Sequence, residues 1–535
     1  MLSLFQVGKE FCGHDSETLQ DSLQKQCLSY FQAYHVARLD ELKTHLENEG
    51  WALCPVKLSF SPRSLIEFGH MKLSLKSPSK TPSKRSSISS SSETGGGTGS
   101  YFVRYWSDGT PFEEVLRDSG GDEDILMLVD GGGFENESSE EEENEPVPAS
   151  ILENNAIYMT GSTNGPRQPW SPPPPRQGFC LANTTLMVLR QFGRYIHLMK
   201  LLHPISSEIL LGIKQLFEFY VYSVYKVFSC SLSADSWIKP LAASNLTNLL
   251  DSVERDIVLK SKQVTEVDAE GNQTTHEITS GLVRAPNTGM AVLPNFEESK
   301  YKGLLEKILG VESCVYLSGQ LVTLLPHVKE SLQDGSLADQ YFADQISIVH
   351  SLRDSLYLTS INKLIGLHHV IPAITKIKWD LKEVRSQHSE YVDLLVKLFH
   401  DFSQRLDQLA GIVPLEPDVR TCIWSLAFQS AAHLFVEGFS TVKKCTNEGR
   451  ALMQLDYRQF ILKMEKLTDI RPIPCQEFVT AYIKAFYIPE SELETWVEVH
   501  PEYSASQLTG LVNAVAYSNN KARQKFEIIV NKIRR

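Results

Sequence analysis

The chain has 535 residues, of which 42% are hydrophobic and 22% are charged. This length exceeds what one hydrophobic core supports, and the composition is that of a globular protein, so we expect several folded units and exclude disorder throughout. The net charge of −13 is concentrated between Asp108 and Glu145, where fifteen acids and one base give −14 and leave +1 for the rest. A nearly neutral body excludes the strong counterion-release binding of a nucleic-acid protein.

Nine cysteines are spread along the chain, and none forms a Cys-x-x-Cys pair. We therefore expect neither a disulfide framework nor a zinc knuckle, and we place the protein in a reducing compartment. The first residues lack the basic and apolar regions of a signal peptide. The longest uncharged stretches, residues 313–328 and 421–436, are shorter than the ~18–20 apolar residues of a membrane span. We expect a cytosolic protein whose membrane contact is peripheral.

The first element, residues 15–49, has apolar residues at three- and four-residue steps and is predicted to be one long amphipathic helix within an N-terminal helical segment, residues 1–71. The next clear helix begins past residue 180. The apolar stripe of the first helix must therefore be covered by a distant segment, a preceding segment or another chain. If this segment is the end of a truncated helical rod, we expect its stripe to be poorly packed.

Residues 72–178 form the second region, which is rich in serine, proline, glycine and acids. Such a composition cannot offset the entropy of ordering, so we predict a disordered linker. Two short apolar islands, residues 101–106 and 125–129, interrupt it. They are either linker hydrophobes or docking motifs.

From residue 179 onward the helical period returns, and we predict a helical bundle region over residues 179–410 and a C-terminal helical bundle over 411–535. Residues 260–296 are a polar loop, and the only expected strand content is a small hairpin there. The fold class is therefore all-α, as irregular stacked helical bundles with a long acidic linker. The helices predicted after the polar loop cover residues 301–309, 311–325, 337–358, 376–409, 422–445, 450–467, 477–487, 490–499 and 505–533.

The sequence contains no common catalytic or cofactor motif, such as a phosphate-binding glycine loop, a His-Glu-x-x-His helix or a Gly-x-Ser-x-Gly turn. The pairs His276-Glu277 and His368-His369 provide too few ligands for zinc, which needs three or four. We predict a non-enzymatic protein with no catalytic residues, no metal and no cofactor. A helical enzyme or lipid-transfer module with an unrecognised site is the alternative.

The end of the chain is a basic amphipathic stretch in which cations alternate with Phe526, Ile528 and Ile529. Such a helix either lies on an anionic membrane or packs into a bundle with its cations complementing the helix dipole. The candidate membrane-facing residues are Lys521, Arg523, Lys525, Lys532, Arg534 and Arg535.

Residues 440–513, which begin STVKKCTNEGRALMQLDYRQF, resemble the C-terminal domain of the syndetin family. Further matches lie in residues 377–399, 183–205 and 30–56, in the order and spacing of that family. The resemblance implies a helical-rod subunit of the endosome-associated recycling protein (EARP) tethering complex, without an active site. Family members carry a long N-terminal coiled-coil and rod region, so we expect this chain to be a C-terminal half.

The resemblance also implies partners and a location. The partners are the other EARP subunits, which are shared with the Golgi-associated retrograde complex, SNARE proteins, and an EARP-interacting WD-repeat protein as a further candidate. The implied process is endocytic recycling of internalised cargo to the plasma membrane and endosomal or retrograde vesicle transport. The implied location is cytosolic, peripherally on recycling endosomes and on trans-Golgi network membranes.

We predict a protein-interaction face within residues 443–503, where the resemblance is densest and prolines fix the connection between helices. Aromatic side chains at a groove edge are common binding anchors. The alternative is that Trp496 and Tyr487 fill a bundle core. The candidate face consists of Arg471, Glu492, Trp496 and Glu498.

Overall fold

The computed structural model describes residues 17–56, 60–69, 178–229, 244–267, 273–286, 299–332, 334–489 and 491–516, together with Gln524. The chain divides into two compact units, and all the described residues except 17–22 belong to the unit formed by Leu23–Ser77 and Pro172–Arg535. Apart from Gly178, the linker predicted over residues 72–178 lies outside the described residues.

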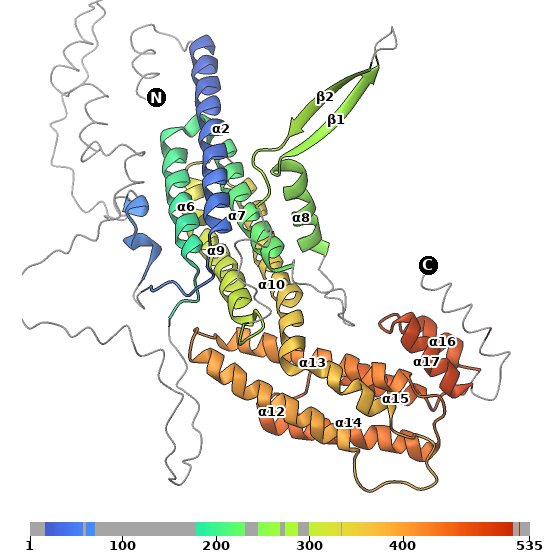
Figure 1. Cartoon of the computed structure of the whole chain (residues 1–535). Helices are drawn as coiled ribbons and strands as arrows, with labels where there is room; N and C mark the ends of the chain where they lie inside the picture. Colours follow the sequence, from blue (N-terminus) through green and yellow to red (C-terminus); the bar gives the residue numbers. More distant parts are fainter. Residues whose placement is uncertain are drawn as a thin grey trace, which may run out of the picture. The chain divides into compact units, whose positions relative to one another are not determined.

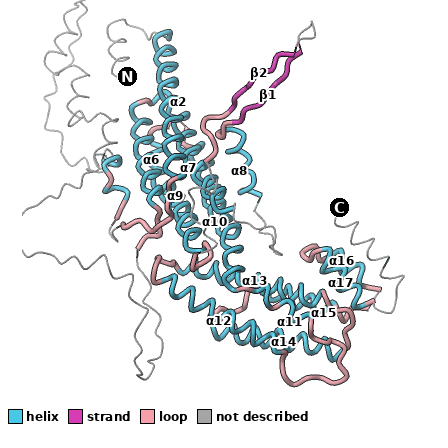
Figure 2. The backbone as a smooth tube through the Cα atoms, viewed as in Figure 1, coloured by secondary structure: helices cyan, strands magenta, loops and turns pink. Residues whose placement is uncertain are grey.

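Helices make up most of the described chain, as Figure 1 and Figure 2 show, and the all-α prediction is confirmed. The N-terminal helices are α2 (Glu17–Glu47), α6 (Asn183–Leu201), α7 (Ser206–Ser229), α8 (Ser244–Asp256), α9 (Leu304–Glu330) and α10 (Ser336–Ile365). The C-terminal helices are α11 (Ile371–Thr375), α12 (Glu390–Ala410), α13 (Pro417–Ser440), α14 (Asn447–Thr468), α15 (Gln476–Ala485), α16 (Leu493–Val499) and α17 (Ala505–Val515).

Among the described residues, the strands form one antiparallel hairpin of β1 (Lys260–Val267) and β2 (Gln273–Ser280). Its register pairs Lys260 with Ser280 and Val267 with Gln273. The hairpin lies inside the polar segment 260–296, where the alternating sequence predicted it.

The prediction of one helix over residues 376–409 is wrong in its first part, because α12 begins only at Glu390. Residues 376–389 are irregular instead. The Trp379 ring is buried and meets Phe439 edge to face at 5.6 Å. The Trp379 carbonyl accepts a hydrogen bond from the Thr446 N–H at 3.2 Å, and a carbonyl used in this way is not available to a helix. Conversely, the two helices predicted over residues 301–325 merge into α9.

The helix α2 lies against α6 and α7, so the prediction that its stripe is poorly packed is wrong from Cys27 onward. The Phe31 ring meets Tyr195 of α6 edge to face at 5.7 Å. His35 accepts a hydrogen bond at Nδ1 from the Tyr195 hydroxyl (2.8 Å) and donates from Nε2 to Gln215 of α7 (2.9 Å), which assigns its tautomer. Leu19, near the helix start, remains 43% exposed. The buried residues of α2 are Cys27, Phe31, His35, Leu39, Leu42 and Leu46.

The long helix α10 belongs to both groups of helices. It packs along α9 and on α7 and α8, and it also contacts α13 and α12. Within the C-terminal helices, α12 packs on α14, and the Phe399 ring lies between Phe428 of α13 (6.0 Å) and Phe460 of α14 (5.5 Å). The end of α10 is also tied to α12, because the Arg405 guanidinium donates to the Leu364 carbonyl at 2.8 Å. The predicted boundary at residue 410 remains a prediction.

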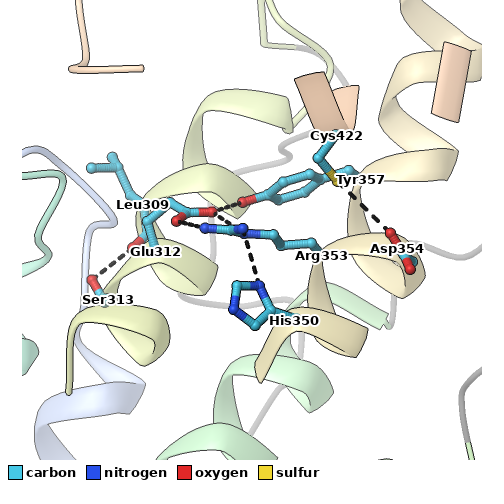
Figure 3. Close-up of polar contacts among 8 residues, drawn as sticks. All are labelled: Leu309, Glu312, Ser313, His350, Arg353, Asp354, Tyr357 and Cys422. Atoms are coloured by element: carbon cyan, nitrogen blue, oxygen red, sulfur yellow. Dashed lines mark hydrogen bonds and ion pairs between the residues drawn. The ribbon is translucent and has the colours of Figure 1, made fainter. Parts of the chain in front are cut away.

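A buried ion pair joins α9 to α10 (Figure 3). The Glu312 carboxylate accepts hydrogen bonds from the Arg353 guanidinium and, at 2.8 Å, from the Tyr357 hydroxyl. The second guanidinium edge contacts His350 at 3.1 Å. Both charged side chains are 8% exposed, so the pair is shielded from water. Every oxygen of the carboxylate has a partner, which is the condition for tolerating such charges in a core.

Among the described residues, α9 is the helix long and apolar enough to cross a membrane by length and composition. Of its most apolar window, 61% is buried inside the protein. It packs between α6, α7 and α10, so its hydrophobicity is that of a central core helix.

The environment of His35 predicts how stability depends on pH. Burial lowers its pKa from 6.5 to about 4, so the unfolded chain takes up a proton first as the pH falls. The contribution of neutral His35 to the free energy of unfolding is therefore complete above pH 6.5. It is lost as the pH falls towards 4, by up to about 1.4 kcal/mol per pH unit. We expect the melting temperature of His35→Gln to fall less between pH 7 and 5 than that of the wild type. His45→Gln, on the exposed side of α2, should behave as the wild type, and equal slopes for all three proteins would contradict the buried docking of α2.

The Glu312–Arg353 pair predicts non-additive stability changes. Replacing one partner, as in Glu312→Gln or Arg353→Met, leaves the other charge buried and alone, which costs about 3–5 kcal/mol. The double variant Glu312→Gln/Arg353→Met should recover most of that loss in chemical denaturation. Losses that simply add would show that the two side chains do not interact.

Candidate protein-interaction surface

The predicted interaction segment, residues 443–503, folds as α14, α15 and α16 with tight connections. Thr446 caps α14 by accepting a hydrogen bond from the Gly449 N–H at 3.2 Å, and Asp469 ends it in the left-handed conformation (φ 58°). The Arg471–Pro472 peptide bond in the following connection is cis. The next helix after this segment, α17, starts with a capping box of Ser504 and Gln507.

An aromatic cluster around Tyr503 ties these helices together. The Tyr503 ring stacks on Phe478 of α15 at 4.8 Å and on Trp496 of α16 at 5.4 Å. Its hydroxyl donates to the Phe478 carbonyl (2.7 Å), and the buried Tyr482 hydroxyl donates to the Gln507 carbonyl (2.7 Å). Burial raises the pKa of both phenols, so each stays a protonated donor. The positions of α15, α16 and α17 are therefore set by one polar and aromatic core.

The four predicted surface residues occupy two places. Glu492 and Glu498 are exposed at the start and the end of α16, while Trp496 between them is half-buried. The Trp496 ring stacks on Tyr503, and its centroid is 4.4 Å from that of the tilted His500 ring, so the side chain contributes both to the core and to the surface. Arg471 lies in the connection between α14 and α15, where its Nε is 3.8 Å from Glu465.

Tyr487, the other aromatic residue weighed for a core role, lies at the surface. It is 44% exposed, and the Arg450 guanidinium stands over its ring at 5.0 Å. The alternative prediction, that both aromatic residues fill a bundle core, is thus wrong for Tyr487, and Trp496 does so only in part. The six predicted membrane-facing cations, Lys521, Arg523, Lys525, Lys532, Arg534 and Arg535, lie outside the described residues, and their role stays a prediction.

A groove between α14 and α15 is a feature that the sequence did not reveal. It has a volume of about 440 Å³ and a mainly apolar lining. Its floor is formed by Tyr457, Ile461 and Ile483, and Leu462 is 41% exposed at its edge. Arg458 of α14 and Lys484 of α15 also line it. The signal in the sequence was Leu462, an apolar residue next to the buried stripe of α14, but the partner helix could not be located without the fold.

Metal binding finds no support in the described part of the chain, where no three His, Cys, Asp or Glu side chains gather around one point. His368 and His369 are both exposed, with ring centroids 3.8 Å apart. A two-ligand pair falls short of a zinc site.

Comparisons with known proteins agree with the resemblance found in the sequence. Residues 301–531 match the family described as "Syndetin, C-terminal". The chain is 36% identical to syndetin of Gallus gallus over 556 aligned residues, which cover 99% of this chain and 57% of that protein. Syndetin of Rattus norvegicus is also 36% identical, over 99% of this chain and 56% of its own length. The chain thus spans little more than half the length of these relatives.

The matched family region begins at residue 301, just before α9, and includes all the helices from α9 to α17. It contains the buried Glu312–Arg353 pair, the aromatic cluster and the groove. The matches to the two relatives extend beyond this region over nearly the whole chain. Residues 301–531 therefore match the C-terminal family of syndetin, and the chain as a whole is similar to a part of syndetin.

Proposed function

We propose that this protein is a non-enzymatic subunit of a multisubunit vesicle-tethering complex that acts in endocytic recycling and in endosomal or retrograde transport. The observation that carries the proposal is the relationship to syndetin over 99% of the chain. The complex in question is EARP, whose other subunits are shared with the Golgi-associated retrograde complex. The protein works through protein–protein contacts that promote tethering and SNARE-dependent fusion.

The architecture is consistent with this role. Helical bundles whose cores are filled by aromatic and aliphatic side chains offer stable faces for other helices. SNARE proteins and an EARP-interacting WD-repeat protein are the further partners that we propose. The location is cytosolic, on the surface of recycling endosomes and trans-Golgi network membranes.

The alternative of a lipid-transfer module requires a large apolar chamber. A cleft of about 840 Å³ beside residues 384–391 is lined mainly by polar groups. The apolar groove between α14 and α15 has only about half that volume. These cavities favour an interaction protein over a lipid carrier.

The interaction face on α16 can be tested by reversing two exposed charges. Glu492→Lys/Glu498→Lys, in the full-length protein, should lower co-purification of the other complex subunits and endosomal recruitment by at least about tenfold, because the rim charges that steer a partner change sign. The melting temperature should stay within about 1 °C, since exposed substitutions change stability little.

The matched control is Asp251→Lys/Glu330→Lys, which reverses two exposed carboxylates on α8 and α9. It should assemble and localise as the wild type. Unchanged recruitment of the α16 variant would remove α16 from the interaction face, and Arg458 and Lys484 of the groove would be tested next.

A further inference from the structure

The irregular segment of residues 376–389, between α11 and α12, is held firmly at both ends although it has no regular secondary structure (Figure 2). At its start, the Thr446 hydroxyl accepts from the Leu381 N–H at 3.1 Å and donates to the Leu381 carbonyl at 2.9 Å. A Cβ on Gly449 would lie 2.0 Å from the Trp379 carbonyl oxygen, so the segment touches the α14 backbone there. At its end, the Ser389 N–H donates to the buried Asp456 carboxylate at 2.8 Å.

Between these anchors, all residues from 382 to 387 are exposed. Val384 at the centre is 70% exposed, one of the two largest exposures among the large apolar side chains described. The fold thus presents an apolar side chain to the surroundings.

Basic side chains surround this tip. Lys376, Lys378, Lys382 and Arg385 of the segment are all exposed, and the adjoining turn before Thr446 adds Lys443 and Lys444. These six cations face three carboxylates, Asp380, Glu383 and Glu390. Asp380 and Lys444 are paired with each other at 2.8 Å and add no net charge, so the other five cations stand against Glu383 and Glu390. The nearby Asp393 is likewise occupied by Lys463 (2.6 Å) and His388 (3.0 Å), so it does not neutralise the patch.

A surface cleft of about 840 Å³ opens between the tip and α11. Its lining includes Lys376 from the start of the segment and Arg385, Ser386 and Gln387 from its later part. The lining contains one carboxylate, Glu390. This volume is within the range of small-molecule sites, and its donor set is suited to phosphate oxygens.

We propose that residues 376–389, with Lys443 and Lys444, form a membrane-docking site that binds the phosphate headgroups of anionic lipids while Val384 enters the interfacial layer. The cations supply the attraction to an anionic surface, and the exposed apolar side chain at the tip gains free energy only if its surroundings are apolar. An acidic peptide would be attracted by the same cations but would leave Val384 in water. The proposal concerns the purified chain and does not depend on the proposed complex.

The test measures binding of the full 535-residue chain to vesicles of phosphatidylcholine alone, with added phosphatidylserine, or with an added phosphatidylinositol phosphate. The wild type should bind the anionic vesicles and not the neutral ones. Lys376→Glu/Arg385→Glu should weaken that binding about 30-fold or more, because each cation near an anionic surface is worth about 1 kcal/mol. Val384→Asp should also weaken it, with an unchanged melting temperature.

The matched control is Lys25→Glu/Arg63→Glu, which reverses two exposed cations on α2 and in the short 3-10 helix Pro62–Ser64 and should bind as the wild type. Vesicle binding that is unchanged in Lys376→Glu/Arg385→Glu would overturn the proposal and point to the cations after residue 520. Binding of a peptide of residues 108–145 in preference to vesicles, lost in the same variant, would also overturn it and assign the patch to an acidic peptide. Binding of soluble inositol hexakisphosphate without any binding to vesicles would also overturn the proposal, because the cations would then bind a free phosphate compound and not a membrane.

Discussion

The arrangement of the described helices depends on the buried charge pair between Glu312 of α9 and Arg353 of α10. A guanidinium and a carboxylate removed from water are stable only in one relative geometry, because each needs the hydrogen bonds of the other. The pair therefore fixes α10 along α9 more strictly than aliphatic packing does. Since α10 continues onto α12 and α13, this single register also sets where the C-terminal helices attach.

A second consequence of this arrangement is that core side chains fix the positions of the helices, while surface side chains form the candidate binding sites. Aromatic clusters around Phe399 and Tyr503 position the C-terminal helices without leaving an enclosed chamber among the cavities described. The candidate binding surfaces are the face of α16, the groove between α14 and α15, and the basic segment before α12. Such separate surfaces allow one rigid domain to contact several molecules at once.

Helical periodicity in the sequence was sufficient to predict the all-α class, the polar hairpin and most helices. It could not show which helices meet, so the partners of α2 and the groove between α14 and α15 were missed. Residues 376–389 were misread because nothing local in the sequence shows that the hydrogen bonds of Trp379 and Leu381 go to Thr446, far along the chain. Glu312 and Arg353 looked like ordinary helix-surface charges, since nothing local in a sequence distinguishes a buried ion pair from an exposed one. The roles of Glu492, Glu498 and Arg471 remain predictions for the same reason: exposure permits binding but does not identify a partner.

Cys54 and Phe60 lie beside the chain that re-enters the described fold at Gly178. The Cys54 N–H donates to the Leu181 carbonyl at 2.8 Å, and the Phe60 and Phe179 rings are 6.2 Å apart. Both contacts join residues that are far apart in the sequence, and they lie directly before the start of α6. The path by which the chain enters α6 is therefore fixed by Cys54 and Phe60, which precede that helix by a long stretch of sequence.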